Sequence, residues 1–266
     1  MIKVAIIGVG GKMGRSILAT LNNDEEITVA GGTELPGHEL VGKDLGEAMG
    51  TESLGINISD NIEDAAGEAD IIVDFTAPES TLLNAEYASN NSKSIVIGTT
   101  GFSTGQKNTL NSFLKSIPSV ISPNMSIGVN LLFELSKNVS KIVGKEFDVE
   151  IVEAHHRNKV DSPSGTALGL AESVAEGLGV NLDDNAVYER HGNIGKRKNN
   201  EIGIQTIRGG DVVGDHTVMF LGEGERIELT HKALSRDNFS KGVLRAVKWL
   251  PGKTPGIYAM KDVLGL

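Results

Sequence analysis

Two adjacent histidines and a lysine stand close together in the sequence, just before a short turn of small residues. His155 and His156 are followed by Lys159, and the turn is Ser164-Gly165-Thr166. Imidazoles and an amine can donate or accept protons, and neighbouring cations would make the proton of Lys159 easier to transfer. The hydroxyls of the turn can cap the helix that follows, and free N–H groups at its start can receive a carboxylate. The segment therefore predicts proton transfer to a small anionic substrate.

The same residues also have a structural interpretation: packed histidines, a solvated lysine and an ordinary helix cap. A metal site shared by His155 and His156 is disfavoured, because adjacent residues at the end of a strand point to different sides. His191, His216 and His231 have no ligand-like spacing with this pair. We expect no metal, and we favour proton transfer because the histidines, the lysine and the turn occur together.

A glycine-rich run, Gly-Val-Gly-Gly-Lys-Met-Gly at residues 8–14, directly follows a predicted strand and opens a predicted helix. The glycines allow a tight turn and a close approach of the backbone to a pyrophosphate, and the helix N-terminus offers free N–H groups to it. A glycine-rich turn without a ligand is the alternative, since the motif alone is weak. Its place after the first strand favours a dinucleotide-binding site.

Glu34 ends the next predicted strand, where a carboxylate can accept hydrogen bonds from the ribose of the cofactor. A carboxylate there repels a 2′-phosphate, Leu35 supplies no compensating cation, and Lys12 is the only basic candidate that we expect nearby. We therefore predict that NADH is used at least as well as NADPH. As a lone residue, Glu34 would equally suit a solvated loop.

Two further loops are expected just past strand ends, on the rim where open α/β sheets bind ligands. They are Gly98-Thr99-Thr100-Gly101 and Ser122-Pro123-Asn124-Met125. Either loop can hydrogen-bond a nicotinamide and its ribose, although in isolation each would be interpreted as an ordinary turn.

The first half of the chain alternates short apolar strands with helices, a pattern typical of a parallel sheet covered on both faces. Strands are predicted at residues 3–7, 27–31, 71–75, 95–98 and 120–122, and helices at 14–22, 78–89 and 105–117.

The pattern changes in the second half. A strand is predicted at residues 147–154, a helix at 166–178, an antiparallel meander at 201–231 and a mobile polar loop at 192–200; a helix at 240–250 and a segment at 260–264 complete the chain. We predict an α/β protein. A Rossmann-like dinucleotide-binding domain takes residues 1–127 and 236–266. An α+β domain with a mixed or antiparallel open sheet takes residues 128–235 and serves substrate binding and oligomerisation.

Composition excludes several classes of protein. The 266 residues carry a formal charge of −10, from 25 basic and 35 acidic residues, which argues against nucleic acid or an anionic membrane as a main partner. The absence of cysteine excludes disulfides, zinc–thiolate sites and semialdehyde dehydrogenases that depend on a cysteine. The first residues enter a strand and no apolar run reaches about 18 residues, so we expect no signal peptide, no membrane span and a cytoplasmic location.

Residues 150–167, together with the glycine run and residues 98–101, resemble the dihydrodipicolinate reductase family, the 4-hydroxy-tetrahydrodipicolinate reductases of lysine and diaminopimelate synthesis. The string Glu-Ala-His-His, followed by Lys159, Asp161 and Pro-Ser-Gly-Thr-Ala, is highly specific to that family, whereas the glycine run is not. The likeness extends nearly end to end and includes residues 74–76, 209–216 and 230–232.

The resemblance implies an NAD(P)H-dependent oxidoreductase that reduces 4-hydroxy-tetrahydrodipicolinate, a small heterocyclic dicarboxylate, to tetrahydrodipicolinate. It implies that His155 is the catalytic proton donor or acceptor and Lys159 the proton donor, with His156, Ser164, Gly165 and Thr166 binding the substrate. The implied cofactor contacts are Gly8, Val9, Gly10, Gly11, Lys12, Met13, Glu34, Gly98, Thr99, Thr100, Ser122, Pro123, Asn124 and Met125. It also implies a homotetramer joined through the sheets of the second domains. Leu35 stands where some relatives carry arginine.

Two other classes remain open at this stage. A different two-domain dehydrogenase would explain the glycine run but not the His-His, Lys and Ser-Gly-Thr string. A catalytically silent nucleotide sensor would be expected to have lost catalytic positions, whereas His155, Lys159 and Thr166 are all present.

Overall fold

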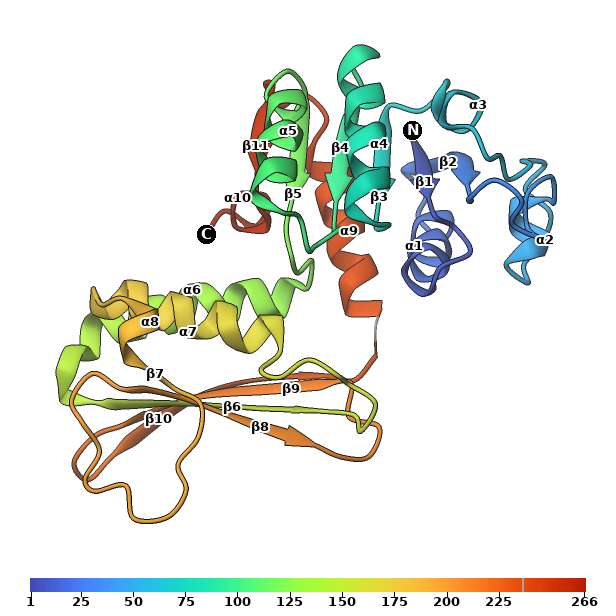
Figure 1. Cartoon of the computed structure of the whole chain (residues 1–266). Helices are drawn as coiled ribbons and strands as arrows, with labels where there is room; N and C mark the ends of the chain where they lie inside the picture. The colour runs from blue at the N-terminus through green and yellow to red at the C-terminus, as the bar shows by residue number, and fades with distance from the viewer. Residues whose placement is uncertain (236) are drawn as a thin grey trace. The chain divides into compact units, whose positions relative to one another are not determined.

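The chain folds into two compact units. The computed structural model describes residues 1–235 and 237–266. One unit comprises Met1–Ile127 and Asp237–Gly265, and the other Gly128–Arg236 with Leu266 (Figure 1). Within the described residues, no helix has the length and apolar character needed to span a bilayer.

The first unit is built on a parallel sheet of six strands in the order β11-β5-β4-β3-β1-β2. The strands are β1 (Ile2–Ile7), β2 (Ile27–Thr33), β3 (Ile71–Asp74), β4 (Ser94–Ile97), β5 (Pro118–Ile121) and β11 (Gly256–Tyr258). The chain adds β2 on one side of β1 and then crosses to add β3 on the other side. The carboxyl ends of β1 and β3 therefore form a topological switch point, where such sheets bind ligands. The predicted Rossmann-like α/β architecture is confirmed.

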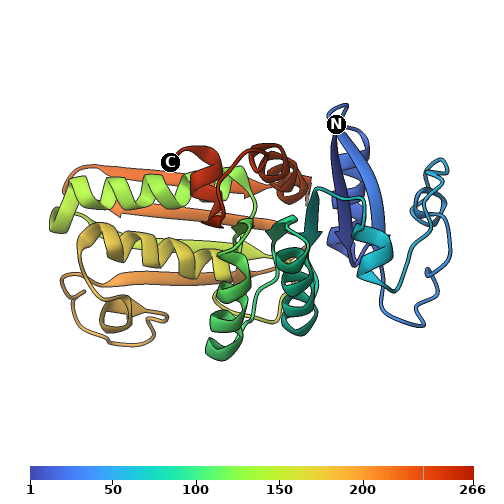
Figure 2. The same ribbon diagram turned by 90° about the horizontal axis from the view of Figure 1, so that it is seen from above.

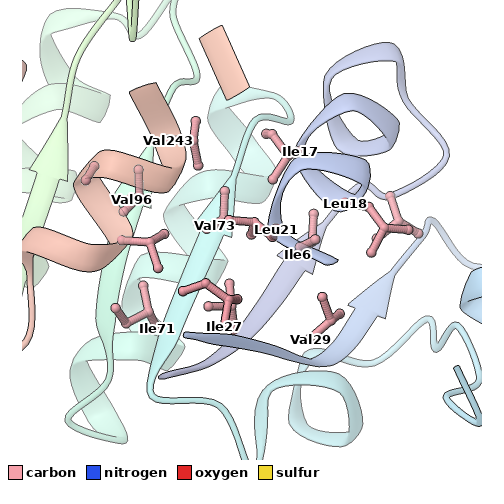
Figure 3. Close-up of a cluster of buried hydrophobic side chains, with 14 of the residues drawn as sticks. Ile6, Ile17, Leu18, Leu21, Ile27, Val29, Ile71, Val73, Val96 and Val243 are labelled. Atoms are coloured by element: carbon pink, nitrogen blue, oxygen red, sulfur yellow. The ribbon is translucent and has the colours of Figure 1, made fainter. Parts of the chain in front are cut away.

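Helices cover both faces of this sheet because β1 alternates its apolar side chains between two cores. Val4 and Ile6 belong to a core with residues of α1 and α9, part of which is drawn in Figure 3. Ala5 and Ile7 belong to a second core with residues of α4 and α5. The helices of this unit are α1 (Lys12–Asn22), α2 (Leu45–Ala48), α3 (Ile62–Ala66), α4 (Pro78–Asn90), α5 (Thr104–Leu114), α9 (Asp237–Trp249) and α10 (Met260–Leu264).

The second unit has a mixed sheet of five strands in the order β10-β9-β6-β8-β7. The strands are β6 (Asp148–His155), β7 (Ala186–Val187), β8 (Ile202–Arg208), β9 (Gly214–Leu221) and β10 (Arg226–Ala233). Only β9 and β10 form the expected antiparallel hairpin. The meander predicted over residues 201–231 is wrong for β8, which pairs parallel to β6 on the side away from β9. The helix α7 (Gly165–Leu178) makes the crossover that a parallel pair requires.

Helices α6 (Ile127–Val143) and α7 lie side by side on one face of the second sheet (Figures 1 and 2). The short segments η1 (Gly144–Glu146) and α8 (Leu182–Asn185) complete this unit. Residues 192–200, predicted as a mobile loop, are fastened to β6. Arg197 donates to Asp148 Oδ1 at 2.7 Å and to the carbonyl of Val149 at 3.1 Å.

Candidate active site

On the helix-covered face of the second sheet, three neighbouring strands change from apolar to polar side chains at the same level. Along β6, the buried positions Val149 and Ile151 are followed by buried Glu153 and His155. The pairing register places Thr206 and Arg208 of β8 beside Glu153 and His155, and His216 of β9 beside Glu153. Ser164, the residue before α7, also bonds to this group. We call Glu153, His155, Ser164, Thr206, Arg208 and His216 the polar cluster.

The carboxylate of Glu153 is the centre of the polar cluster. Arg208 donates to it through Nη1 and Nη2, both at 2.8 Å, and the backbone N–H of Ser164 donates at 3.0 Å. Its Oε2 lies 2.6 Å from Nδ1 of His155, and the Thr206 hydroxyl donates to Oε1 at 3.2 Å. Burial raises the pKa of Glu153, but the hydrogen bonds from Arg208 and His155 outweigh burial and lower the pKa to about 2. The carboxylate is therefore ionised at neutral pH.

His155 and His216 lie in contact but in different environments. Their rings pack edge to face, with centroids 5.1 Å apart and planes inclined at 74°. His216 Nε2 lies 3.0 Å from the Ser164 hydroxyl. Burial, assisted by the neighbouring His155, lowers the pKa of His216 to about 4. His216 is therefore neutral at pH 7, and His155 is the imidazole that contacts a carboxylate.

The predicted helix cap is confirmed at Ser164. Its hydroxyl accepts a hydrogen bond from the N–H of Ala167 at 3.1 Å, as the N-cap of α7. A Cβ atom built at Gly165 would meet no other atom within 4 Å. The start of α7 thus combines a positive helix dipole with open space for an anionic group.

Lys159 and His156 lie in the loop that leaves β6. The Lys159 ammonium donates to Asp161 Oδ1 at 2.8 Å, and this bond is the main cause of a lowered pKa for Asp161. The sequence analysis considered only neighbouring cations, whereas the side-chain contact of the Lys159 ammonium is with a carboxylate. His156 donates its backbone N–H to the carbonyl of Val212 at 2.7 Å, and its buried Nδ1 has no partner among the described residues.

A cavity of about 540 Å³ opens in the same unit. Its lining includes Thr206 of the polar cluster, Ser162 and Pro163, which directly precede Ser164, and Tyr188 and Arg190. None of the residues predicted to bind or protonate substrate lines it, so we do not assign the substrate to this cavity.

In the first unit, the glycine run forms a tight turn between β1 and α1. Gly8 has φ +74°, and the N–H groups of Gly8 and Val9 donate to the carbonyl of Thr33 at 2.9 and 3.0 Å. A Cβ at Gly14 would lie 2.2 Å from the Gly8 carbonyl oxygen, so only glycine lets α1 approach the turn this closely. The N-cap, Gly11, provides no side-chain hydrogen bond to the first turn of α1. The N–H groups at this end suit a phosphate.

Glu34 lies directly against the glycine turn. Its Oε1 accepts from the N–H of Gly10 at 2.6 Å and its Oε2 accepts from the N–H of Leu35 at 3.2 Å. The Leu35 side chain is largely exposed. Arg15 donates through Nε to the carbonyl of Gly10 at 2.9 Å. Gly10 is thus contacted both by Glu34 and by Arg15, a cation that the sequence analysis did not name.

A buried carboxylate that the sequence analysis did not single out organises the loop after β3. Asp74 accepts from the N–H and hydroxyl of Thr76 at 3.0 and 2.6 Å, and from the Asn84 side chain at 2.8 Å. Burial raises the pKa of Asp74, and this effect exceeds the lowering of the pKa by these hydrogen bonds. A Cβ at Gly8 would lie 2.9 Å from Cγ2 of Thr76, so this loop and the glycine turn meet at the switch point.

The loop after β4 is tied to the loop after β3. The buried Thr99 hydroxyl accepts from the N–H of Thr76 at 3.1 Å and from the Thr81 hydroxyl at 2.8 Å. A Cβ at Gly98 would lie 1.9 Å from the Phe75 ring, which explains the glycine. Thr100 is exposed beside them. The predicted cofactor residues Gly98, Thr99 and Thr100 thus stand on the rim of the sheet, near the switch point.

The loop after β5 has a mixed character. The Ser122 hydroxyl donates to the carbonyl of Asn124 at 2.7 Å, and Asn124 Oδ1 accepts from the N–H of Ser126 at 2.8 Å. Pro123 is exposed. The Met125 side chain lies in the core, and its carbonyl faces Gly242, where a Cβ would be only 1.8 Å away. Neither the side chain nor the carbonyl of Met125 is available to a ligand.

No group of three or more histidine, aspartate and glutamate residues in the described parts of the chain is arranged to hold a metal ion. The sequence analysis assigned no role to Glu153, Arg208, His216 and Asp74, which lie near strand ends; Arg208 is partly buried and the other three are buried. Their signal in the sequence is a polar residue at the next inward position of an apolar strand.

Comparisons with known proteins agree over the whole chain. Residues 2–125 match the family model of the dihydrodipicolinate reductase N-terminus, and residues 128–264 match that of the C-terminus. A 4-hydroxy-tetrahydrodipicolinate reductase of Geobacter metallireducens is 48% identical over 266 residues, and one of Geotalea uraniireducens is 49% identical; both comparisons cover 100% of each chain.

Solved structures give the same result. A dipicolinate-bound dihydrodipicolinate reductase from Paenisporosarcina sp. TG-14 has a TM-score of 0.78 at 26% identity, covering 98% of each chain. The myo-inositol dehydrogenase of Lactobacillus casei, in complex with NAD(H) and myo-inositol, has a TM-score of 0.59 at 13% identity, covering 99% of this chain and 90% of that one. The second likeness concerns the fold alone.

Proposed function

The chain belongs to the dihydrodipicolinate reductase family, and from this premise we propose that it reduces 4-hydroxy-tetrahydrodipicolinate to tetrahydrodipicolinate with NADH or NADPH, in diaminopimelate and lysine biosynthesis. One hydride and one proton are added to the ring system, and the hydroxyl group of the substrate leaves as water. The observation that carries the proposal is the full-length match to relatives of this activity. The alternative of a different two-domain dehydrogenase explains neither that match nor the polar cluster.

The residues of the first unit fit a dinucleotide. The uncapped start of α1 and the close approach at Gly14 suit a pyrophosphate, and Glu34 is placed to accept hydrogen bonds from ribose hydroxyls. We propose that residues 8–13, Glu34 and the exposed parts of the loops at 98–100 and 122–125 hold the cofactor. When bound, the reduced nicotinamide supplies the hydride.

The residues of the second unit bind the substrate and supply the proton in this proposal. Gly165 and Thr166, at the positive end of α7, receive one carboxylate of the substrate, and His156 and Ser164 assist from the flanking positions. His155 and Lys159 provide the proton that the ring requires once it has gained electron density. On approach of the substrate, Lys159 exchanges its contact with Asp161 for one with the substrate.

The function is tested by a coupled assay. The preceding synthase generates the substrate, and the purified chain is expected to consume NADH in the presence of that product and not without it. Failure to consume either NADH or NADPH would overturn the proposed activity.

The same assay tests the cofactor preference. The Glu34 carboxylate repels a 2′-phosphate, so we expect kcat/KM with NADH to equal or exceed that with NADPH. A Leu35→Arg variant adds a cation next to Glu34 and should shift the ratio toward NADPH by about tenfold, the effect of roughly 1.4 kcal/mol. Leu83→Arg adds the same charge at another exposed apolar position and serves as control. A strong preference of the unmodified chain for NADPH would contradict this assignment.

We further propose a cytoplasmic homotetramer joined through the sheets of the second unit. In the single chain, β10 is an edge strand with mostly exposed side chains, including Ile227. An unpaired edge is open to association. Size-exclusion chromatography with light scattering should give four times the mass of the chain, and a monomer at micromolar concentration would overturn the assembly.

A further inference from the structure

We propose that Glu153 is a positioning residue for proton transfer, which holds His155 with Nδ1 protonated and thereby makes Nε2 the nitrogen that exchanges a proton with the substrate. This role rests on the proposed function. It concerns a residue that lies beneath the histidine and is itself fully buried.

The hydrogen bonds of Glu153 decide the direction of its contact with His155. Ser164, Thr206 and Arg208 all donate to this carboxylate. An ionised carboxylate has no proton to give, so Nδ1 of His155, 2.6 Å away, is the donor. Because Nδ1 keeps its proton, neutral His155 carries its lone pair on Nε2, and charged His155 has its transferable proton there.

The surroundings leave Nε2 available for this role. Within the described chain, Nε2 of His155 has no hydrogen-bond partner, and the nearby Gly214 has no side chain, where a Cβ would lie 3.0 Å from that nitrogen. His216 does not compete for Glu153, because it is neutral and its Nε2 contacts Ser164. The rings of His216 and His155 pack edge to face, and this contact restricts rotation of the His155 imidazole.

A purely structural role for Glu153 is the alternative, since the carboxylate also binds Ser164 at the start of α7 and the guanidinium of Arg208. Glu150 provides a matched control on the same strand. It pairs with Arg190 at 2.8 Å and Arg197 at 3.3 Å, and its side chain lies on the opposite face of β6. Loss of either carboxylate removes a partly or fully buried ion pair, but only Glu153 contacts a histidine.

The test compares Glu153→Gln with Glu150→Gln in the full chain. Glutamine keeps the shape of the side chain but replaces one carboxylate oxygen with an NH₂ group, which cannot accept the hydrogen bonds that the surrounding residues donate. We expect Glu153→Gln to lower kcat by roughly 10- to 100-fold, within the usual range for impaired acid–base catalysis. The KM for the substrate and the KM for the cofactor should each change by less than about threefold. Glu150→Gln should lower Tm while leaving kcat within about twofold. Equal kcat in the two variants would show that Glu153 is only a structural anchor.

Long-range ¹H–¹⁵N NMR of the ¹⁵N-labelled chain gives a readout independent of activity. The His155 signals are assigned by their loss in His155→Asn, and in the unmodified protein they should show the Nδ1–H tautomer when the ring is neutral. Glu153→Gln should lose that preference. An Nε2–H tautomer in the unmodified protein overturns the proposal, even if Glu153→Gln does not fold. If the coupled assay fails while the Nδ1–H tautomer is found, the proposed activity is wrong but the positioning of His155 stands.

Discussion

Replacing Lys159 by alanine is expected to lower kcat by about 10²–10⁴-fold, the usual contribution of a general acid. The structure supports the assignment because Lys159 lies in the loop after β6, four residues after His155, and its ammonium forms a partly exposed ion pair with Asp161. Such a pair contributes little to stability, so the variant should fold with a nearly unchanged Tm. The assay is steady-state turnover with synthase-generated substrate.

Two further variants separate proton donation from charge. Lys159→Arg keeps the positive charge, but a guanidinium hardly gives up a proton at neutral pH, so kcat should remain almost as low as in the alanine variant. Lys137→Ala removes another lysine of the same unit that is paired with a carboxylate, Glu176, and should leave kcat unchanged. Full turnover in folded Lys159→Ala would contradict the role of this ammonium.

Replacing His155 by asparagine should also lower kcat by roughly 10²–10⁴-fold, because Nε2 is lost from the proton-transfer step. Asparagine can still donate to Glu153, so the ionised carboxylate keeps a partner. His191→Asn, at an exposed position of the same unit, is the control and should retain kcat. We expect kcat of the double variant of His155 and Lys159 to be only slightly lower than kcat of the less active single variant. The effects of residues that act in the same step are not additive. Unchanged turnover in folded His155→Asn would exclude it as the donor or acceptor.

The first unit follows closely from its sequence because each apolar run is short, nearly continuous and ends at a turn. Such runs predict strands buried on both faces, and the strands found at Ile71–Asp74 and Ser94–Ile97 lie within one residue of the prediction. The glycine run also predicted the need for a glycine at position 14. Any larger residue there would clash with the Gly8 carbonyl, against which α1 packs.

The second unit was less predictable, for two physical reasons. Helix α6 was not predicted; besides buried residues such as Leu132, it carries the apolar residues Leu131 and Leu135 at exposed positions, which widen its apolar face. The predicted antiparallel pairing of β8 is wrong. The alternation of side chains along a strand does not specify which strand will pair with it, or in which direction.

The candidate site shows the same division. His155, Lys159 and the Ser164 cap are neighbours in sequence and could be selected from it. Arg208 and His216 lie more than fifty residues after Glu153 in the sequence, and only the pairing register of the strands brings them to it. The polar cluster has one local signal in the sequence: Glu153 occupies the inward-facing position that follows Val149 and Ile151 along β6.

The most direct test of the central claim is a crystal structure of the chain with NADH and pyridine-2,6-dicarboxylate, a planar analogue of the substrate. We expect one carboxylate within about 3.2 Å of the N–H groups at the start of α7, and the ring edge in hydrogen-bond reach of His155 Nε2 or Lys159 Nζ. Density for the dicarboxylate away from both the start of α7 and these two side chains would contradict the account.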